Sequence, residues 1–201
     1  MADYLKILTE DIHSAAIATL DKNGRPITRI IDIMLYDDQG IYFLTAKGKE
    51  FYRQLMEQKY ISLSAVKEKR SITLRGETEN IGNEKLDEIF EKNPYMKGIY
   101  PDDTREALEV FRLYKAAGEF FDISDPTNVT RGSISIGNAK EQSGIYFVKG
   151  KCSGCKACFS VCPQKCIDVS KVPAVINQNH CLHCGRCFEI CPEKAIVKGA
   201  C

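Results

Sequence analysis

Apolar residues in the first 125 positions fall into short runs separated by turn residues, which is typical of a β-rich domain. Turn sequences such as DKNGRP and DDQG separate the first of these runs. Several strands at such short spacing favour a β-barrel over a βαβ sheet. The runs predict five strands, at residues 14–20, 27–35, 41–46, 60–66 and 71–82.

Two segments of the same region have helical spacing instead. The sequence GKEFYRQLMEQK at 48–59 places its apolar residues on one face. The sequence NEKLDEIFEKN at 83–93 begins with an asparagine N-cap and stops before Pro94. Residues 108–124 predict two more strands, joined through a short Ala-Gly kink. We therefore expect a domain that is mainly β with some α.

Composition and charge narrow the class of protein. The chain has 201 residues, 44% of them hydrophobic, so it has enough apolar content to bury a core in one or two domains. Its formal net charge of +1 argues against a nucleic-acid-binding arm or a polybasic membrane anchor. The N-terminal sequence MADYLKILTEDIH is mixed and charged, unlike a signal peptide. We expect a cytoplasmic protein with no nucleic-acid or membrane partner.

The placement of cysteine divides the chain. All ten cysteines lie between Cys152 and Cys201, and residues 1–151 contain none. In a cytoplasmic protein this density indicates metal or redox chemistry rather than disulfides. The stretch 126–144 is rich in Gly, Ser and Asn and predicts a linker or an active-site flap. The domains expected on either side of it are residues 1–125 and 145–201.

Two cysteine cassettes share the spacing C-x2-C-x2-C-x3-C-P, which is that of bacterial iron–sulfur proteins. They are CSGCKACFSVCP from Cys152 and CLHCGRCFEICP from Cys181. Three thiolates spaced by two residues can wrap three corners of a compact cube, while the fourth corner needs a ligand from further away. The proline after the fourth cysteine turns the chain away from the cluster. A zinc ribbon needs only two C-x2-C pairs, so the third cysteine favours iron–sulfur clusters over zinc.

The cassettes also form an internal repeat. Residues 152–167 and 181–196 are identical at eight of sixteen positions, counted from the sequence. The C-terminal part, 146–201, therefore resembles the two-cluster bacterial ferredoxins, which implies a small α+β domain with two [4Fe-4S] clusters. Its short strands are expected around 145–149, 167–169, 174–176 and 196–198.

The resemblance implies a crossed set of cluster ligands. One cluster is expected on Cys152, Cys155, Cys158 and Cys191, and the other on Cys181, Cys184, Cys187 and Cys162. Cys166 occupies the slot that Ala195 fills in the second repeat, so the simplest interpretation is a small buried residue. The roles of Cys166 and Cys201 stay open.

The N-terminal part resembles a second family. The ordered set NGRP, TRIIDI, YFLTAKGK, FYRQL, ISLSAV and LRGE, within residues 5–124, is similar to the FMN-binding split barrels related to pyridoxamine 5′-phosphate oxidase. The resemblance implies a split β-barrel that forms a homodimer with two FMN molecules at the subunit interface. The chain has no Trp, whereas pyridoxamine 5′-phosphate oxidases hold their substrate with a segment rich in Trp and Arg, so a different substrate is expected.

The same resemblance implies the flavin contacts. The ring is expected along the strand TRIIDI, and Arg75 lies where the next strand approaches the ring. The phosphate is expected at Arg29 and at the turn TAKGK, although this turn reads Lys49-Glu50-Phe51 where many family members carry Ser-Arg-Lys. The expected contacts are Arg29, Ile30, Ile31, Asp32, Thr45, Ala46, Lys49 and Arg75.

Joining the two parts predicts a function. Four-iron clusters carry one electron each and FMN accepts one or two, so we expect an FMN-dependent oxidoreductase. Electrons would pass from a low-potential donor, such as a ferredoxin- or flavodoxin-like protein, through two [4Fe-4S] clusters and FMN to a small-molecule acceptor. The oxygen sensitivity of exposed clusters fits an anaerobe. Two alternatives stay open: a non-enzymatic electron-transfer protein, or a split barrel that binds haem or a deazaflavin. The sequence identifies neither the acceptor nor a catalytic residue.

Overall fold

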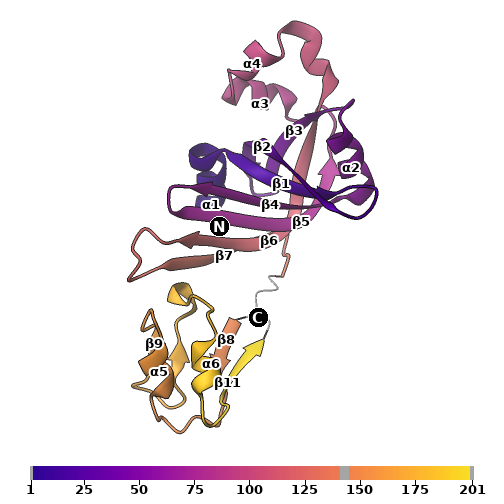
Figure 1. The fold of residues 1–201 in the computed structure, drawn as a ribbon. Coiled ribbons are helices and arrows are strands. Elements are labelled where there is room, and N and C mark those ends of the chain that lie inside the picture. The colour runs from indigo at the N-terminus through magenta and orange to yellow at the C-terminus, as the bar shows by residue number, and fades with distance from the viewer. Residues whose placement is uncertain (1, 141–144, 200–201) are drawn as a thin grey trace. The chain divides into compact units, whose positions relative to one another are not determined.

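The computed structural model of the chain describes residues 2–140 and 145–199, which belong to two compact units (Figure 1). The first unit comprises Met1–Glu119 and Ile134–Lys140. The second comprises Phe120–Ser133 and Glu141–Cys201. In the described ranges, no helix has the length and apolar character needed to cross a membrane.

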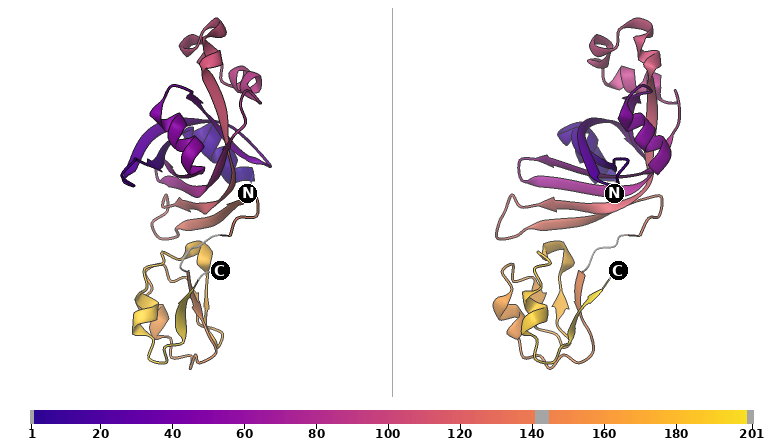
Figure 2. Two further views of the ribbon diagram at one scale, coloured as in Figure 1. Left: turned by 90° about the vertical axis from the view of Figure 1, so that its right-hand side faces the viewer. Right: turned by 45° about the vertical axis from the view of Figure 1, so that its right-hand side comes forward.

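A seven-stranded sheet dominates the described part of the first unit (Figures 1 and 2). Its order is β3-β2-β1-β4-β5-β6-β7, and β3 also pairs with β6, so the strands from β3 to β6 close into a barrel. This closure confirms the expected mainly β fold with a split barrel. The bounds are β1 Ser14–Leu20, β2 Pro26–Asp37, β3 Gly40–Ala46, β4 Tyr60–Lys67, β5 Arg70–Asn80, β6 Leu108–Asp122 and β7 Thr130–Ile136.

Alternation of apolar and small residues fills the barrel. In β1, Ala15 and Ile17 are buried, whereas the intervening Ala16 is only partly buried. Helix α2 (Glu50–Gln58) buries Phe51 and Leu55, and the Phe51 ring stacks on Phe43 of β3 with centroids 6.1 Å apart. The helix therefore completes the apolar interior that the strands begin.

A second apolar cluster lies on the other side of β3. Tyr42 and Leu44 face it, while their neighbour Phe43 points into the barrel. The cluster is covered by helices α3 (Leu86–Lys92) and α4 (Met96–Ile99). The remaining helical segments of the unit are α1 Ala2–Lys6, the π-helical turn η1 Ile7–Ile12 and the 3₁₀ helix η2 Asp102–Ala107.

Two features of the sheet differ from the sequence prediction. Strand β6 runs unbroken through Ala117-Gly118, where a kink between two strands was expected. A side chain at Gly118 would collide with the backbone of Thr73 in β5, so this glycine permits close packing rather than a break. The stretch 126–144, for which the sequence predicted a linker or flap, instead contains strand β7. Its Ile134 and Ile136 are buried at alternate positions, as in a strand with one face against the core. Residues 141–144 of that stretch lie outside the described residues.

The cysteine-rich unit is an internal repeat in structure as well as in sequence. Helix α5 (Ala157–Val161) matches α6 (Arg186–Ile190), 29 positions later in the chain. Positive φ angles recur at the same offset, as at Lys156 (62°) and Gly185 (80°). The described strands pair as β8 Ile145–Val148 with β11 Ile196–Gly199, and β9 Ile167–Asp168 with β10 Val175–Ile176; η3 spans Gln178–His180.

The segment Phe120–Ser133, which carries the turn between β6 and β7, groups with the cysteine-rich unit. The Val129 N–H donates to Gln164 Oε1 at 3.2 Å, and His180 Nδ1 donates to the Val129 carbonyl at 2.8 Å. Arg131 Nε donates to the Cys181 carbonyl at 3.2 Å. These bonds hold the turn against the start of the second cassette.

We predict that Gly118→Val destabilises the barrel, because its side chain would have to displace the β5 backbone. The expected loss in unfolding free energy is about 3 kcal/mol, the upper part of the usual range for overpacking. Gly98→Ala is the matched control, since a Cβ at Gly98 meets nothing within 4 Å. Urea unfolding followed by circular dichroism measures both, and equal midpoints for the two variants would contradict the close β5–β6 packing.

Candidate functional site

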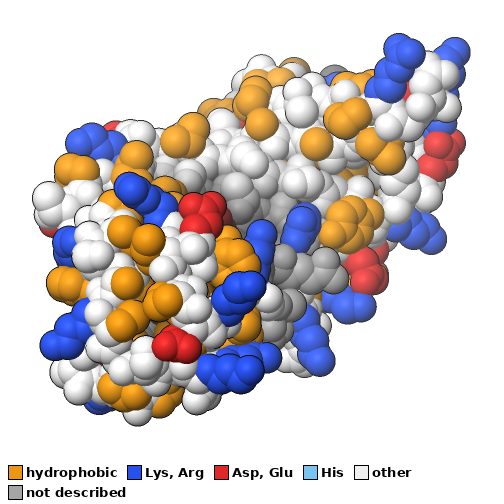
Figure 3. All heavy atoms as spheres, turned by 60° about the horizontal axis from the view of Figure 1, so that its bottom comes forward, with side chains coloured by type: hydrophobic (Ala, Val, Ile, Leu, Met, Phe, Trp, Pro, Cys, Tyr) orange, Lys and Arg blue, Asp and Glu red, His pale blue; other side chains and the backbone are white. Residues whose placement is uncertain are grey.

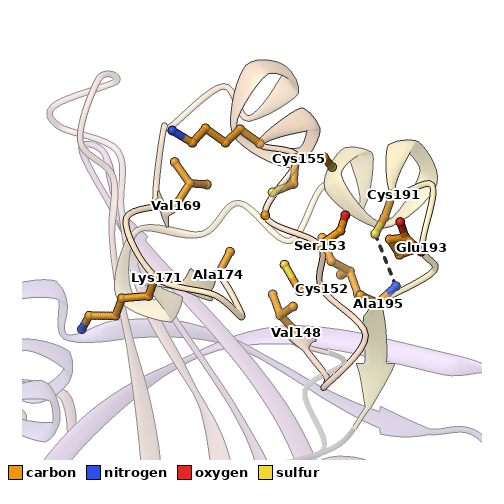
Figure 4. Close-up of a pocket in the computed structure, with 14 residues that line it drawn as sticks. Val148, Cys152, Ser153, Cys155, Val169, Lys171, Ala174, Cys191, Glu193 and Ala195 are labelled. Carbon is orange, nitrogen blue, oxygen red and sulfur yellow. Dashed lines mark hydrogen bonds between the residues drawn. The ribbon is translucent and has the colours of Figure 1, made fainter.

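Four cysteines line one cavity of the cysteine-rich unit (Figure 4). Cys152, Cys155 and Cys158 come from the first cassette, and Cys191 enters from the second. The space between the lining atoms totals about 440 Å³ when open solvent is included, and the cavity volume proper is about 20 Å³. Figure 4 shows the side chains of Cys152, Cys155 and Cys191 around this space, with Ala195 beside Cys191. The structure thus brings together the four residues expected to hold one cluster.

A second cavity repeats the arrangement. The space between its lining atoms totals about 330 Å³ with open solvent included, and the cavity volume proper is about 20 Å³. Three of its cysteines come from the second cassette, while Cys162 enters from the first. A fifth cysteine, Cys166, also lines it and is half-buried rather than buried. Across residues 2–140 and 145–199, no three His, Cys, Asp or Glu side chains converge on a single metal-ion position. The second-cassette cysteines are Cys181, Cys184 and Cys187.

Backbone N–H groups point at two of these sulfurs. Ala195 N–H donates to Cys191 Sγ at 3.3 Å, and His183 N–H donates to Cys181 Sγ at 3.4 Å. Such bonds stabilise a thiolate and tune a bound cluster. Burial raises the pKa of Cys187 to about 11, so its thiolate forms when iron displaces the proton. The donor set of each cavity therefore fits a four-iron cluster.

Basic residues outnumber acidic ones around the cysteines. Residues 145–201 contain eight Lys and Arg against three Asp and Glu, a formal excess of 8 − 3 = +5. Figure 3 shows Lys and Arg side chains outnumbering Asp and Glu on the face that comes forward. Eight thiolates around two clusters bring negative charge, and the basic residues offset it.

Arg29 lies on the inner face of β2, beside Ile17 of β1. Its guanidinium donates to Thr19 Oγ1 at 2.6 Å and to Gln54 Oε1 at 2.9 Å, and it stacks 4.4 Å from the Phe51 ring. In the described part of the chain no carboxylate pairs with it, and burial lowers the pKa of Arg29. A half-buried cation held only by neutral groups fits a phosphate.

The turn after β3 lies at the start of α2. Lys49 is the N-cap residue of this helix, and its N–H donates to the Ala46 carbonyl at 3.0 Å. The first N–H groups of a helix lack intrahelical partners and attract anions. Thr45 is buried, and its Oγ1 has no hydrogen-bond partner within the described ranges. The negative charge of Glu50 would repel an anion at this helix start, but both of its carboxylate oxygens accept hydrogen bonds from Arg53.

Arg75 does not join this group. The strand register places it in a row with Ser62 and Ala18, on the outer face of the barrel, whereas Arg29 points inward. Ile30, 68% exposed, lies on the same outer face as Arg75, and the residues between them are small. Of the expected ring contacts, Ile30, Asp32 and Arg75 therefore lie on a flat outer surface, whereas Ile31 pairs with the buried Ala15 on the inner face. The expected phosphate contacts lie around α2.

Asp32 belongs to a hydrogen-bonded group that sequence reasoning missed. Ser14 Oγ donates to Asp32 Oδ1 at 2.6 Å, and Tyr95 Oη donates to Asp32 Oδ2 at 3.1 Å. His13 Nδ1 donates to the Thr9 carbonyl at 3.1 Å, and its Nε2 lies 2.9 Å from Tyr95 Oη. Burial and the charge of Asp32 raise the pKa of Tyr95 to about 12.

The sequence offers no local signal for this group, because Tyr95 lies 63 residues from Asp32. His13 directly precedes β1 and adopts a φ of 70°, which is rare for a residue other than glycine. Neither the contact nor the backbone angle follows from local pattern.

Two family models match the chain. The model described as "Pyridoxamine 5'-phosphate oxidase" covers residues 1–117, and the "4Fe-4S dicluster domain" covers residues 151–195. Together they assign FMN to the barrel and two [4Fe-4S] clusters to the cysteine-rich part.

Curated relatives match part of the chain. A dihydrophenazinedicarboxylate synthase from Pseudomonas chlororaphis is 32% identical over 116 residues, covering 55% of this chain and 52% of the relative. A pyridoxine/pyridoxamine 5′-phosphate oxidase from Agrobacterium fabrum is 30% identical over 130 residues, covering 59% of this chain and 62% of the relative. The chain thus spans a little over half the length of these relatives.

A solved structure supports the fold. A NimC/NimA family protein from Clostridium acetobutylicum superposes with a TM-score of 0.56 at 18% identity, over 67% of this chain and 92% of the other. The family match over more than half of the chain decides the assignment. The chain belongs to the pyridoxamine 5′-phosphate oxidase family, with a two-cluster iron–sulfur domain following its barrel.

Proposed function

We propose that the protein is an oxidoreductase that passes electrons from a low-potential one-electron donor, through two [4Fe-4S] clusters, to FMN and then to a small-molecule acceptor. The observation that carries the proposal is the presence of two four-cysteine cavities in the same chain as an FMN-family barrel. Clusters supply single electrons, and a flavin supplies them singly or in pairs. The pairing of these groups suits a reaction that needs two electrons from a one-electron source.

The cysteine-rich unit supports exchange with a donor protein. Cys155 and Cys184, one from each cavity, are exposed, so both proposed clusters have an edge near the surface. The surrounding excess of basic residues favours a donor with an acidic surface, such as a ferredoxin- or flavodoxin-like protein. Reduced thiols persist in a reducing cytoplasm, which is the location that the proposal requires.

The group around Asp32 supports proton delivery to the acceptor. Tyr95 keeps its proton at neutral pH because burial and Asp32 raise its pKa. His13 lines a cavity of about 400 Å³ together with Thr9, Glu10 and Lys92, which is large enough for a small molecule. In the proposal, this cavity admits the acceptor, and His13, oriented by its contacts to Tyr95 Oη and the Thr9 carbonyl, passes the acceptor a proton that it regains from solvent.

The barrel surface supports a homodimer. Ile30 is exposed on the outer face of β2, and the neighbouring row on β1 and β4 consists of Ala16 and Ser64. Small side chains leave this face flat, which suits close approach of a second copy or a flavin ring. We propose that two copies pair here and that each contributes to an FMN site.

The double variant Cys155→Ala/Cys184→Ala tests the electron path. This variant should keep its FMN but lose its clusters. Anaerobic reduction of FMN by a reduced ferredoxin should then slow by at least about 100-fold, because the clusters that carry single electrons to FMN are missing. Stopped-flow absorbance of the flavin measures the rate, and iron content verifies the loss. Ser160→Ala, at an exposed serine that lines neither cavity, is the control that keeps both clusters. Equally fast reduction without clusters would refute the path, whereas fast reduction without turnover of any small molecule would indicate a pure electron carrier.

Arg29→Gln tests the phosphate site. Losing a charge-assisted bond costs about 1.5–3 kcal/mol, so FMN should bind roughly 10- to 150-fold more weakly. Arg25→Gln, an exposed arginine in the preceding turn, is the matched control and should bind FMN as the wild type does. Quenching of FMN fluorescence on titration measures both affinities. Unchanged affinity in the Arg29 variant would remove this residue from the site.

Tyrosine titration tests the group around Asp32. At about pH 11, one unit above an ordinary tyrosine, Tyr95 should remain protonated, so wild type and Tyr95→Phe should contain the same number of tyrosinates. In Asp32→Asn the opposing charge is gone and the pKa of Tyr95 falls, so this variant should gain tyrosinate relative to Asp32→Asn/Tyr95→Phe. Ultraviolet difference absorbance measures the tyrosinates. A full extra tyrosinate in the wild type over Tyr95→Phe would disprove the arrangement.

A further inference from the structure

The second cysteine cavity has one more thiol than a four-iron cluster needs. Cys166 lines it together with the four expected ligands. Its Sγ lies 3.6 Å from that of Cys162, the ligand that crosses over from the first cassette. Cys166 is half-buried, and it also packs within the apolar cluster around Ile167 and Ile176. The fifth thiol therefore belongs to the cavity itself and not to the outer surface of the unit.

Among the residues that the structure describes, no fifth thiol lines the first cavity, although its backbone is the same there. Lys165 and Lys194 occupy matching turns with φ angles of 49° and 48°. Each lysine N–H donates to the carbonyl of the preceding cysteine, at 3.3 Å to Cys162 and 3.1 Å to Cys191. The next residue is Cys166 in the first repeat and Ala195 in the second. One turn therefore presents a sulfur and its counterpart presents only a methyl group.

We propose that Cys166 is a reserve ligand of the second cluster, able to replace Cys162 on its iron. The two residues are four positions apart in one tight turn, so their sulfurs approach the same corner of the cavity. In the exchange, the Cys166 thiol releases its proton to solvent as its Fe–S bond forms. The iron gives up its bond to Cys162, which leaves as a thiol after taking a proton, and no electron changes hands. Within residues 145–199, the first cavity offers no such alternative thiol.

This proposal rests on the two-cluster assignment but not on the electron path or the acceptor. Iron content, acid-labile sulfide and electron paramagnetic resonance of the reduced protein test it without any activity assay. Wild type should hold about eight irons per chain, which is two four-iron clusters. If anaerobically prepared wild type holds markedly fewer, the two-cluster assignment fails and the reserve ligand fails with it.

The pseudo-symmetry of the unit supplies matched variants. Cys162→Ala should still hold about eight irons, whereas Cys191→Ala should fall to about seven or fewer, because an iron without a ligand is lost. Cys162→Ala/Cys166→Ala should behave like Cys191→Ala. Cys166→Ala alone should keep about eight, and its bound FMN verifies folding. In Cys162→Ala, the resonance of one cluster should change shape without losing intensity, because one ligand has moved.

The decisive comparison is between the two single variants. If Cys162→Ala loses as much iron as Cys191→Ala, while both retain FMN, Cys166 does not ligate iron and the proposal is wrong. If Cys162→Ala and Cys162→Ala/Cys166→Ala hold equal amounts of iron, the rescue does not come from Cys166, and the proposal is equally wrong.

Discussion

Each cysteine cassette supplies one cysteine to the cavity of the other cassette, and the cysteine-rich unit depends on this exchange. Cys191 enters the cavity of the first cassette and Cys162 enters that of the second. Neither cavity is complete until both cassettes have folded together, so the repeat forms one cooperative unit and not two independent halves. Binding of iron would add to this coupling, because metal-binding free energy becomes folding free energy when the site exists only in the folded chain.

In the barrel, the corresponding constraint is the buried charge of an arginine. A half-buried arginine without an acidic partner is unfavourable unless its charge is met by another group. Arg29 is held by Thr19 and Gln54 and lies over Phe51, all neutral, close to the start of a helix. The arrangement is poised for an anion, and a bound phosphate would remove the unfavourable burial of the charge. If FMN and the clusters bind as proposed, the stability of each unit depends on its cofactor.

Local sequence patterns carried much of the fold. Alternation identified β1 through β5, and the resemblance to two-cluster ferredoxins grouped the same four cysteines that line each cavity in the structure. The patterns failed where a long-range contact overrides local preference. Gly118 was expected to break β6, but the close approach of Thr73 requires a glycine within a continuous strand. Strand β7 was missed because its composition is that of a loop.

The candidate flavin site shows the same limit. The strand TRIIDI could be found from sequence, but only the register shows that Arg29 and Arg75 point to opposite faces. The contact between Tyr95 and Asp32 joins residues far apart in the chain, so no periodicity announces it. The sequence shows that the two repeats differ at one matching position, with Cys166 in the first and Ala195 in the second. Only the structure shows that the Cys166 sulfur lies close to the sulfur of Cys162.

The segment Phe120–Ser133 has a consequence for how such a protein can arise. Because this segment groups with the cysteine-rich unit while Ile134–Lys140 returns to the barrel, the chain passes between the units at three points along its length. A recombination event that exchanged only the residues after 140 would leave behind the turn that bonds to Gln164, His180 and Cys181. The two parts are therefore not interchangeable modules, and a transplanted iron–sulfur domain would have to bring its own hairpin turn.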